Sequence, residues 1–189
     1  MSVLNSNNQD FQKLIQSAQN GNTKALETLI RQVQKTIYAT FYHLTDKKED
    51  IADLTQETLL KMAKYINTLK DVSKFKSWIN KIVSSVFYNY MKKNSHIQME
   101  FNEEYLNEIK DKFSCSPGQK CFLNEINKLI RATVIALPHN LKITLILREF
   151  EGLSYEDISK ITNVSLGTVK SRIARARARL QKELKNYIW

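Results

Sequence analysis

Five cationic side chains lie within ten consecutive residues of the stretch SLGTVKSRIARARARL. They are Lys170, Arg172, Arg175, Arg177 and Arg179. Arginine presents a planar fork of N–H donors that can bind a phosphate, or the edge of a guanine, through two hydrogen bonds. The Arg–Ala alternation in this stretch has a period of two. A strand, a solvated basic helix, a membrane-surface helix and a nucleic-acid-reading helix are therefore all open at this point.

The apolar residues around the arginines decide the secondary structure. They recur at helical spacing over about six turns and fall within a sector of about 80° on a helical wheel. Their positions are Leu166, Val169, Ile173, Ala176, Leu180, Leu184 and Tyr187. This stripe is far longer than the alternation, and alanine and arginine both favour helices, so a helix is predicted. A membrane-surface helix is disfavoured because the stripe has neither Trp nor Phe.

A short helix and a tight turn precede the basic helix. Ser154 and Asp157 have the spacing of a capping box, Asn163 suits a left-handed turn, and Ser165 can cap the next helix. The layout is that of a helix-turn-helix, whose second helix places its exposed N-terminal residues in the major groove of DNA. The residues expected at DNA are Thr168, Lys170, Ser171, Arg172, Arg175, Arg177 and Arg179. The sequence therefore predicts a DNA-binding helix here.

Composition agrees with a helical protein that binds an anionic partner. The chain has 189 residues, 42% hydrophobic residues, only 4 Gly and 2 Pro, and a net charge of +10. Scarce Gly and Pro favour long helices, and the charge favours nucleic acid, an acidic protein or a membrane surface as partner. No apolar run approaches the roughly 20 residues of a membrane span, and the N-terminus lacks the pattern of a secretory signal. We expect no membrane insertion and a cytoplasmic protein.

Charge and periodicity divide the chain into three parts. Residues 1–93 hold 14 basic and 8 acidic residues, residues 94–120 hold 3 and 5, and residues 121–189 hold 12 and 6. Apolar residues at helical spacing fill both basic blocks, whereas the acidic middle shows only a short helical pattern near 103–112. We predict an all-α fold of two small helical domains joined by a flexible linker. The expected bounds are 1–94, 95–120 and 121–189, with the helix-turn-helix in the last.

The sequence offers little that could support an enzyme or a cofactor. The three histidines, His43, His96 and His139, lie in different segments, and there is no Gly-rich phosphate loop. Cys115 and Cys121 have no further ligand residues near them, although a structural zinc site wants four. We interpret both as incidental thiols, with a redox or partner contact as the alternative, and we expect no catalytic residue, metal or cofactor.

The C-terminal motifs resemble a known family. The segment LPHNLKITLILREFEGLSYEDISKITNVSLGTVKSRIARARARL resembles region 4 of bacterial RNA polymerase sigma factors of the extracytoplasmic-function (ECF) group. The segment DIADLTQETLLKMAKYINTLKDVSKFKSWINKIVSSVFYNYMKKN resembles region 2 of the same family. Both regions occur in the family's order, joined without a region 3, and the resemblance covers about residues 10–185. The resemblance implies a subunit that programmes transcription initiation, binding core RNA polymerase and promoter DNA.

The resemblance also implies roles for residues. Region 2 would dock on the largest polymerase subunits and hold the −10 element, and region 4 would read the −35 element. The polymerase-binding motif is matched by Asp53, Leu54, Gln56 and Glu57. The −10 reader is matched by Lys70, Ser73, Lys74, Lys76, Lys81, Tyr88, Asn89 and Lys92. In region 4, Arg177 and Arg179 are assigned to phosphates or polymerase rather than to bases.

Two other functions remain open from the residues alone. A helix-turn-helix regulator could bind DNA without binding polymerase. Such a regulator is expected to carry a ligand-binding or phospho-receiver domain in place of the segment that holds the region 2 motifs. A nuclease or recombinase would need the metal or nucleophile cluster that the motifs lack. For the sigma factor we expect a monomer when free and control by an anti-sigma factor. We also expect the acidic linker to lie near the basic surfaces, since opposite charges attract.

Overall fold

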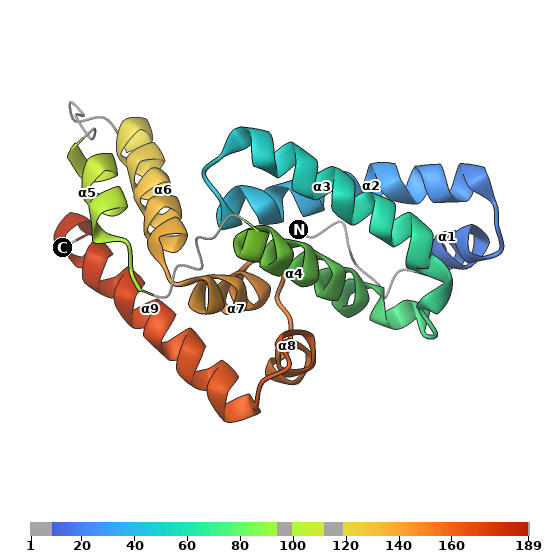
Figure 1. Cartoon of the computed structure of the whole chain (residues 1–189). Helices are drawn as coiled ribbons and strands as arrows, with labels where there is room; N and C mark the ends of the chain where they lie inside the picture. The colour runs from blue at the N-terminus through green and yellow to red at the C-terminus, as the bar shows by residue number, and fades with distance from the viewer. Residues whose placement is uncertain (1–8, 94–99, 112–118, 189) are drawn as a thin grey trace. The chain divides into compact units, whose positions relative to one another are not determined.

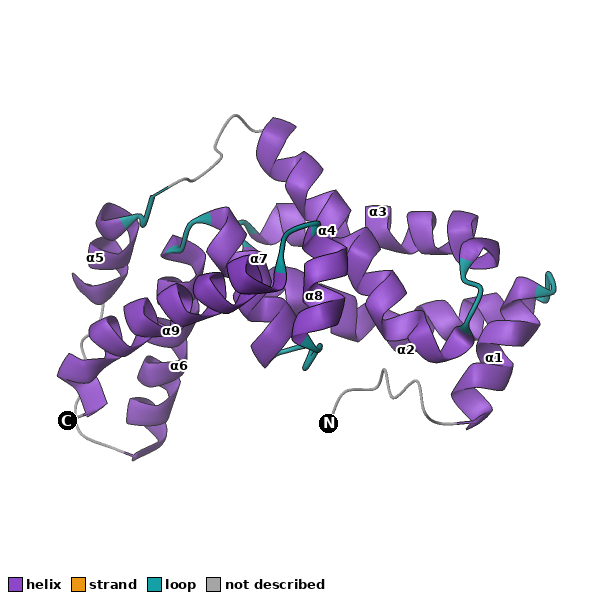
Figure 2. Ribbon diagram, turned by 90° about the horizontal axis from the view of Figure 1, so that it is seen from below, coloured by secondary structure: helices purple, strands orange, loops and turns teal. Residues whose placement is uncertain are grey.

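The computed structural model describes residues 9–93, 100–111 and 119–188, and within these ranges it contains helices and no strand. Figure 2 shows the helices joined by short loops. The chain divides into two compact units. One comprises Met1–Ser95 with Lys160–Asn163, and the other comprises His96–Ser159 with Val164–Trp189. The all-α prediction is confirmed for the described residues, none of whose helices is long and apolar enough to cross a bilayer.

The first unit is built from four helices and two short 3-10 turns (Figure 1). The helices are α1 (Gln9–Gln19), α2 (Thr23–Leu44), α3 (Lys48–Tyr65) and α4 (Phe75–Lys93), and the 3-10 turns are Ile66–Thr68 and Val72–Lys74. Gly21 ends α1 at a φ of 84°, which costs a residue without a side chain little. Asn22 then caps α2, because its Oδ1 accepts a hydrogen bond from the Ala25 N–H at 3.1 Å.

The core of this unit joins all four helices. One apolar stripe from each helix is buried, as the 3.6-residue period predicts. The side chains at its centre include Ile15, Leu29, Ile37, Phe41, Ile51, Met62, Phe75, Ile79 and Phe87. The ring of Phe75 meets the ring of Phe11 edge to face at 5.5 Å, so the start of α4 packs directly on α1. This packing fixes where the loop between α3 and α4 ends.

The second unit contains α5 (Glu103–Asp111), α6 (Gln119–Ala136), α7 (His139–Glu149), α9 (Leu166–Ile188) and, up to Ser159, α8 (Tyr155–Thr162). Helix α9 packs against α6 and α7 and buries Val169, Ile173 and Ala176 completely or almost so. These three residues belong to the predicted apolar stripe. The helical interpretation of the Arg–Ala alternation is therefore confirmed.

The short helix near 103–112 is present as α5, but it does not stand free between two domains. Leu106 is buried against Leu129, Ala132 and Ala136 of α6, with Leu184 of α9 beside them. The N–H of Asn102 also donates to the carbonyl of Ala136 at 2.9 Å, which satisfies a carbonyl at the end of α6. Residues 101–111, expected in the linker, thus pack as part of the second unit.

Candidate nucleic-acid and protein interfaces

The turn before α9 sets the direction of the basic helix. Asn163 adopts a φ of 53°, the left-handed conformation expected of it, and the Ser159 hydroxyl donates to the Val164 carbonyl across the turn. Ser165 caps α9, since its Oγ accepts from the N–H of Thr168 at 3.2 Å. At the start of α8, the N–H of Asp157 likewise donates to Ser154 Oγ at 3.0 Å. The capping and turn residues of the predicted helix-turn-helix thus act as expected.

Thr168, Ser171, Arg172 and Arg175 share one face in the N-terminal half of α9. At about 100° per residue they fall within about 100° of each other, and Arg179 continues this face nearer the C-terminal end of the helix. Burial, together with the nearby positive charge of Arg175, lowers the pKa of Arg172. Such a lowering reflects first the burial of the guanidinium and then the charge of Arg175, and hydrogen bonds to a phosphate or a guanine edge would favour the charged form. We call these four residues the α9 reading face.

Lys170 and Arg177 lie on another side of α9. They are close to each other on the helical wheel but well away from the α9 reading face. The guanidinium of Arg177 donates to Glu149 of α7 through Nε at 3.0 Å and also through a terminal nitrogen. These bonds raise the pKa of Arg177 and tie α9 to α7. Arg177 is solvent-exposed and can still meet a phosphate, but only in competition with Glu149.

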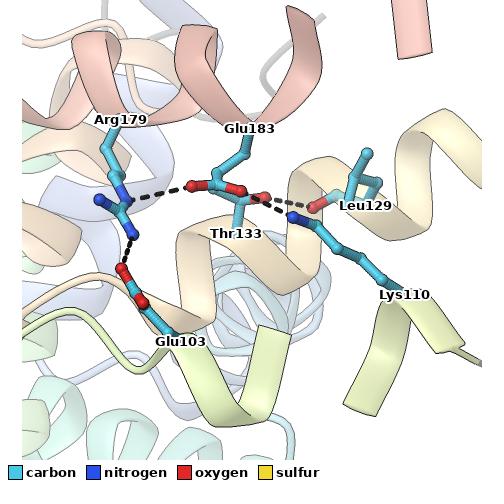
Figure 3. A network of polar contacts seen from close by, with 6 residues as sticks. All are labelled: Glu103, Lys110, Leu129, Thr133, Arg179 and Glu183. Carbon is cyan, nitrogen blue, oxygen red and sulfur yellow. Dashed lines mark hydrogen bonds and ion pairs between the residues drawn. The ribbon is translucent and has the colours of Figure 1, made fainter. Parts of the chain in front are cut away.

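Arg179 lies on the same side of α9 as the α9 reading face, but its side chain is held by ion pairs inside the second unit (Figure 3). Its guanidinium lies 2.7 Å from Glu103 of α5 and 3.3 Å from Glu183, and it covers the ring of Phe101 at 3.7 Å. The Arg179 side chain is only 23% exposed. We therefore leave Arg179 out of the proposed DNA contacts, because its charge is already neutralised. Sequence reasoning missed this role because Glu103 lies 76 residues away.

Helix α5 is fixed to α9 at a second point. Lys110 Nζ lies 2.7 Å from Glu183, so Glu183 bridges Arg179 and Lys110 (Figure 3). Glu103, an acid of the predicted linker, pairs with Arg179, whereas the expectation that this segment lies near the DNA-binding surfaces stays a prediction. These ion pairs and the apolar contacts of Leu106 together hold α5.

The ion pair between Glu103 and Arg179 predicts a pH-dependent attachment of α5. The hydrogen bond from Arg179, and then its charge, lower the pKa of Glu103. Because the pKa of Glu103 is lowered, the ionised carboxylate stabilises the attachment of α5 fully above the ordinary glutamate pKa of about 4.3. This stabilisation is lost as the pH falls through the lowered pKa of the folded state. The NMR amide signals of residues 103–111 should therefore shift toward the detached state on acidification.

The variant Glu103→Gln should show that weaker attachment already at neutral pH and should flatten its pH dependence. The variant Glu104→Gln, at the exposed neighbouring position, should behave like the unaltered protein. An unchanged acid response in Glu103→Gln would contradict the assignment.

The loop between α3 and α4 carries the predicted −10 reader. Lys70 and Lys74 are exposed, whereas the Ser73 hydroxyl and N–H both donate to Asp71 Oδ1, at 2.6 and 2.9 Å. These bonds lower the pKa of Asp71 and shape the 3-10 turn. Ser73 therefore orders the loop, and the two lysines supply its positive charge.

The predicted residues on α4 divide between two sides of the helix. Lys81, Tyr88, Asn89 and Lys92 are exposed on one face, and Tyr88 is 53% exposed. Lys76 is partly buried and lies about 140° around the helix from Lys81, so the structure does not bring it to this face. An exposed aromatic ring between cations suits a single strand, whose bases stack and whose phosphates are anionic.

The predicted polymerase-binding motif forms a stripe on α3. Asp53, Gln56 and Glu57 are exposed, but Leu54 is only 4% exposed and packs in the core, so we remove its side chain from the proposed contacts. Leu60 lies on the same face and is 64% exposed. Leu60 is not part of the matched motif, but its position off the buried stripe of α3 is a signal that the sequence contains. An apolar side chain amid acids and amides is a typical centre of a protein interface.

The described residues hold no group of three or more His, Cys, Asp or Glu side chains placed to bind a metal ion. Cys115 and the side chain of Cys121 lie outside the described residues, so the expectation about these thiols stays a prediction.

Comparisons with known proteins identify both units. The family described as Sigma-70 region 2 matches residues 29–97, and the one described as Sigma-70, region 4 matches residues 127–180. The RNA polymerase sigma-H factor of Pseudomonas aeruginosa is 30% identical over 179 residues, covering 92% of this chain and 93% of its own. The ECF RNA polymerase sigma-E factor of Haemophilus influenzae is 29% identical over 181 residues, with coverages of 92% and 94%.

Solved structures are also similar to this chain. The sigma factor RpoE of Bartonella quintana, in complex with the anti-sigma factor NepR, is similar with a TM-score of 0.60 and 27% identity, covering 86% of this chain and 98% of that one. CnrH, in complex with the cytosolic domain of CnrY, shares the fold with a TM-score of 0.64 at 18% identity.

Proposed function

The chain belongs to the ECF group of RNA polymerase sigma factors, and we propose how its named residues divide the work of starting transcription. The protein acts with polymerase in promoter-specific initiation and not as a free-standing regulator. The α9 reading face binds the −35 element, and the loop of residues 66–74 with the exposed face of α4 binds the −10 strand. The α3 stripe of Asp53, Gln56, Glu57 and Leu60 binds core polymerase. We propose region 2 within residues 1–94 and region 4 within residues 121–189, and we assign α5 of the predicted linker 95–120 to the second unit, on which it packs.

One observation carries this division most directly. A single chain presents a reading helix with paired arginines in one unit, and a separate polar stripe with an exposed leucine in the other. A helix-turn-helix regulator needs only the first surface. A subunit that brings another protein to DNA needs both surfaces: a basic one for DNA, and an acidic one with an apolar centre for the protein partner.

The same proposal covers partners and location. Two similar structures are complexes with an anti-sigma factor or with a cytosolic partner domain, which supports an anti-sigma factor as regulator here too. Because the work is done on DNA with polymerase, we place the protein in the bacterial cytoplasm and assign it no reaction or cofactor of its own. We expect the free protein to be a monomer.

The decisive test is reconstitution. The purified chain is mixed with bacterial core polymerase, and promoter fragments are selected from random duplex DNA by the resulting holoenzyme. Co-elution with core polymerase and enrichment of two spaced sequence elements are expected. Failure to co-elute would overturn the polymerase role, and enrichment of a single palindrome by the free chain would favour the separate regulator.

The α3 stripe predicts a specific loss of polymerase binding. Leu60→Asp places a charge at the centre of the proposed contact, and we expect core-polymerase affinity to fall at least about tenfold, or about 1.4 kcal/mol. Asp53→Ala with Glu57→Ala should act in the same direction. Binding of the free protein to −35 duplex DNA should not change. Glu27→Ala, at another exposed acid of the same unit, is the matched control. Equal losses in this control would contradict the assignment.

A further inference from the structure

Both ends of the segment that leads from α3 into α4 rest on α1. The side-chain amide of Gln19 donates to the carbonyl of Ile66 at 2.9 Å and to the carbonyl of Leu69 at 2.7 Å. At the other end, Phe11 packs edge to face on Phe75. Helix α1 (Gln9–Gln19) lies outside the residues matched by either sigma family, so the family match does not assign it a role.

Gln19 is a fixed anchor. It is the last residue of α1, where the turn at Gly21 follows and the N–H of Asn20 still bonds to the Gln16 carbonyl at 3.0 Å. Both hydrogens of its amide group are used, one for each carbonyl. The two acceptors lie 47 and 50 residues further along the chain. These bonds therefore tie the beginning of the loop to the C-terminal end of α1.

Other contacts also restrain the loop between these anchors, and Ile66 at its start is buried. Leu69 is buried, and its N–H bonds back to the Ile66 carbonyl at 3.2 Å, which closes the first 3-10 turn. Asp71 then orders the second turn through Ser73. Lys70 and Lys74 are exposed on this frame. The two bonds from Gln19 add to these restraints on the first turn, from which Lys70 leaves.

We propose that α1 is a positioning element for the −10 reader and that Gln19 is its positioning residue. This inference rests on the proposed function of the loop. A loop held in its binding shape before DNA arrives does not lose conformational freedom when an unpaired strand binds. Gln19 touches no DNA in this scheme. It keeps the carbonyls of Ile66 and Leu69 in place, so that the lysines and the exposed face of α4 meet one strand together.

The test compares Gln19→Ala and Gln19→Glu with the unaltered chain in the reconstituted holoenzyme. The probe is a fluorescent single-stranded oligonucleotide that carries the non-template −10 strand of a promoter fragment selected by the unaltered holoenzyme. We expect Gln19→Ala to weaken its binding about tenfold. Gln19→Glu should weaken it further, because its carboxylate faces two carbonyl oxygens and donates nothing. Binding of core polymerase and of the −35 duplex should stay within twofold.

Gln16→Ala is the matched control, since Gln16 is an exposed glutamine on the same helix. It should bind the oligonucleotide like the unaltered chain. Amide exchange in the free protein gives a readout that needs no DNA. In Gln19→Ala it should quicken in residues 66–74 but not in the middle of α3.

Three results would overturn the inference. The first is a lowered melting temperature for Gln19→Ala with unchanged oligonucleotide affinity well below that temperature, because Gln19 would then serve stability alone. The second is an equal loss of −35 and −10 binding. The third is unchanged exchange in residues 66–74. Failure of the unaltered holoenzyme to bind the oligonucleotide would instead overturn the proposed −10 role of the loop and of the exposed face of α4.

Discussion

Replacing Phe75 with alanine is expected to destabilise the first unit by about 3–5 kcal/mol, the usual range for removing a fully buried phenylalanine. Phe75 is completely buried, and its ring contacts Phe11 at 5.5 Å and Trp78 at 5.8 Å between ring centroids. The lost ring would leave a cavity where α1 meets the start of α4. Such a loss is a large part of the stability of a small domain.

Urea unfolding followed by the fluorescence of Trp78 would measure this change. The second unit should melt as before, because Phe75 contributes only to the first. Tyr88→Ala is the matched control, since it also removes a ring from α4 but one that is largely exposed, and it should cost less than about 0.5 kcal/mol. A comparable loss in both variants would show that the core is not centred on Phe75.

Replacing Arg175 with alanine is expected to weaken −35 binding by about 1–3 kcal/mol, or roughly fivefold to 150-fold. Arg175 is exposed on the α9 reading face, and its Nε lies 3.4 Å from the Ser171 carbonyl, which holds the guanidinium over the first turns of the helix. Loss of a forked contact to a base should also relax the preference at one position of the element. Binding to core polymerase should be unchanged.

The measurement is the affinity of the purified protein for the selected −35 duplex and for a set of single-base variants. Lys185→Ala removes one positive charge from an exposed position near the other end of α9 and is the matched control. A uniform loss across all duplexes in Arg175→Ala would assign Arg175 to a phosphate instead of a base. A similar loss of −35 affinity in Lys185→Ala would show that the effect of Arg175→Ala comes only from the change in net charge.

The local features of the reading helix were readable from the sequence. Periodicity over six turns outweighed the Arg–Ala alternation, and the structure buries Val169, Ile173 and Ala176 as that period requires. The turn at Asn163 and the caps at Ser154 and Ser165 could be read for the same reason. Helix caps and turns depend on hydrogen bonds between residues three or four apart, so they can be predicted from short stretches of sequence.

The exposure of a helical side chain could be predicted from the sequence only where its position on the helical wheel determines which face of the helix it occupies. Leu54 belongs to the buried stripe of α3 and Leu60 to its exposed side, a difference that the helical wheel contains but that the motif obscured. Lys76 and Lys81 both match the −10 reader of the family, yet their separation around α4 places them on different sides of the helix. Motif membership says which residues matter to a family and not which way each side chain points.

The sequence by itself determined the helices, their caps, the order of the two regions and the surplus of positive charge. The tertiary structure alone decided which charges are free to act. Arg179 looks like Arg175 in sequence, but Glu103 and Glu183 neutralise it, while Arg175 stays on the open face. Gln19 carries no local signal, yet it holds two carbonyls about 50 residues away. Electrostatic and hydrogen-bond partners are set by distance in space, and a one-dimensional pattern reports only neighbours along the chain.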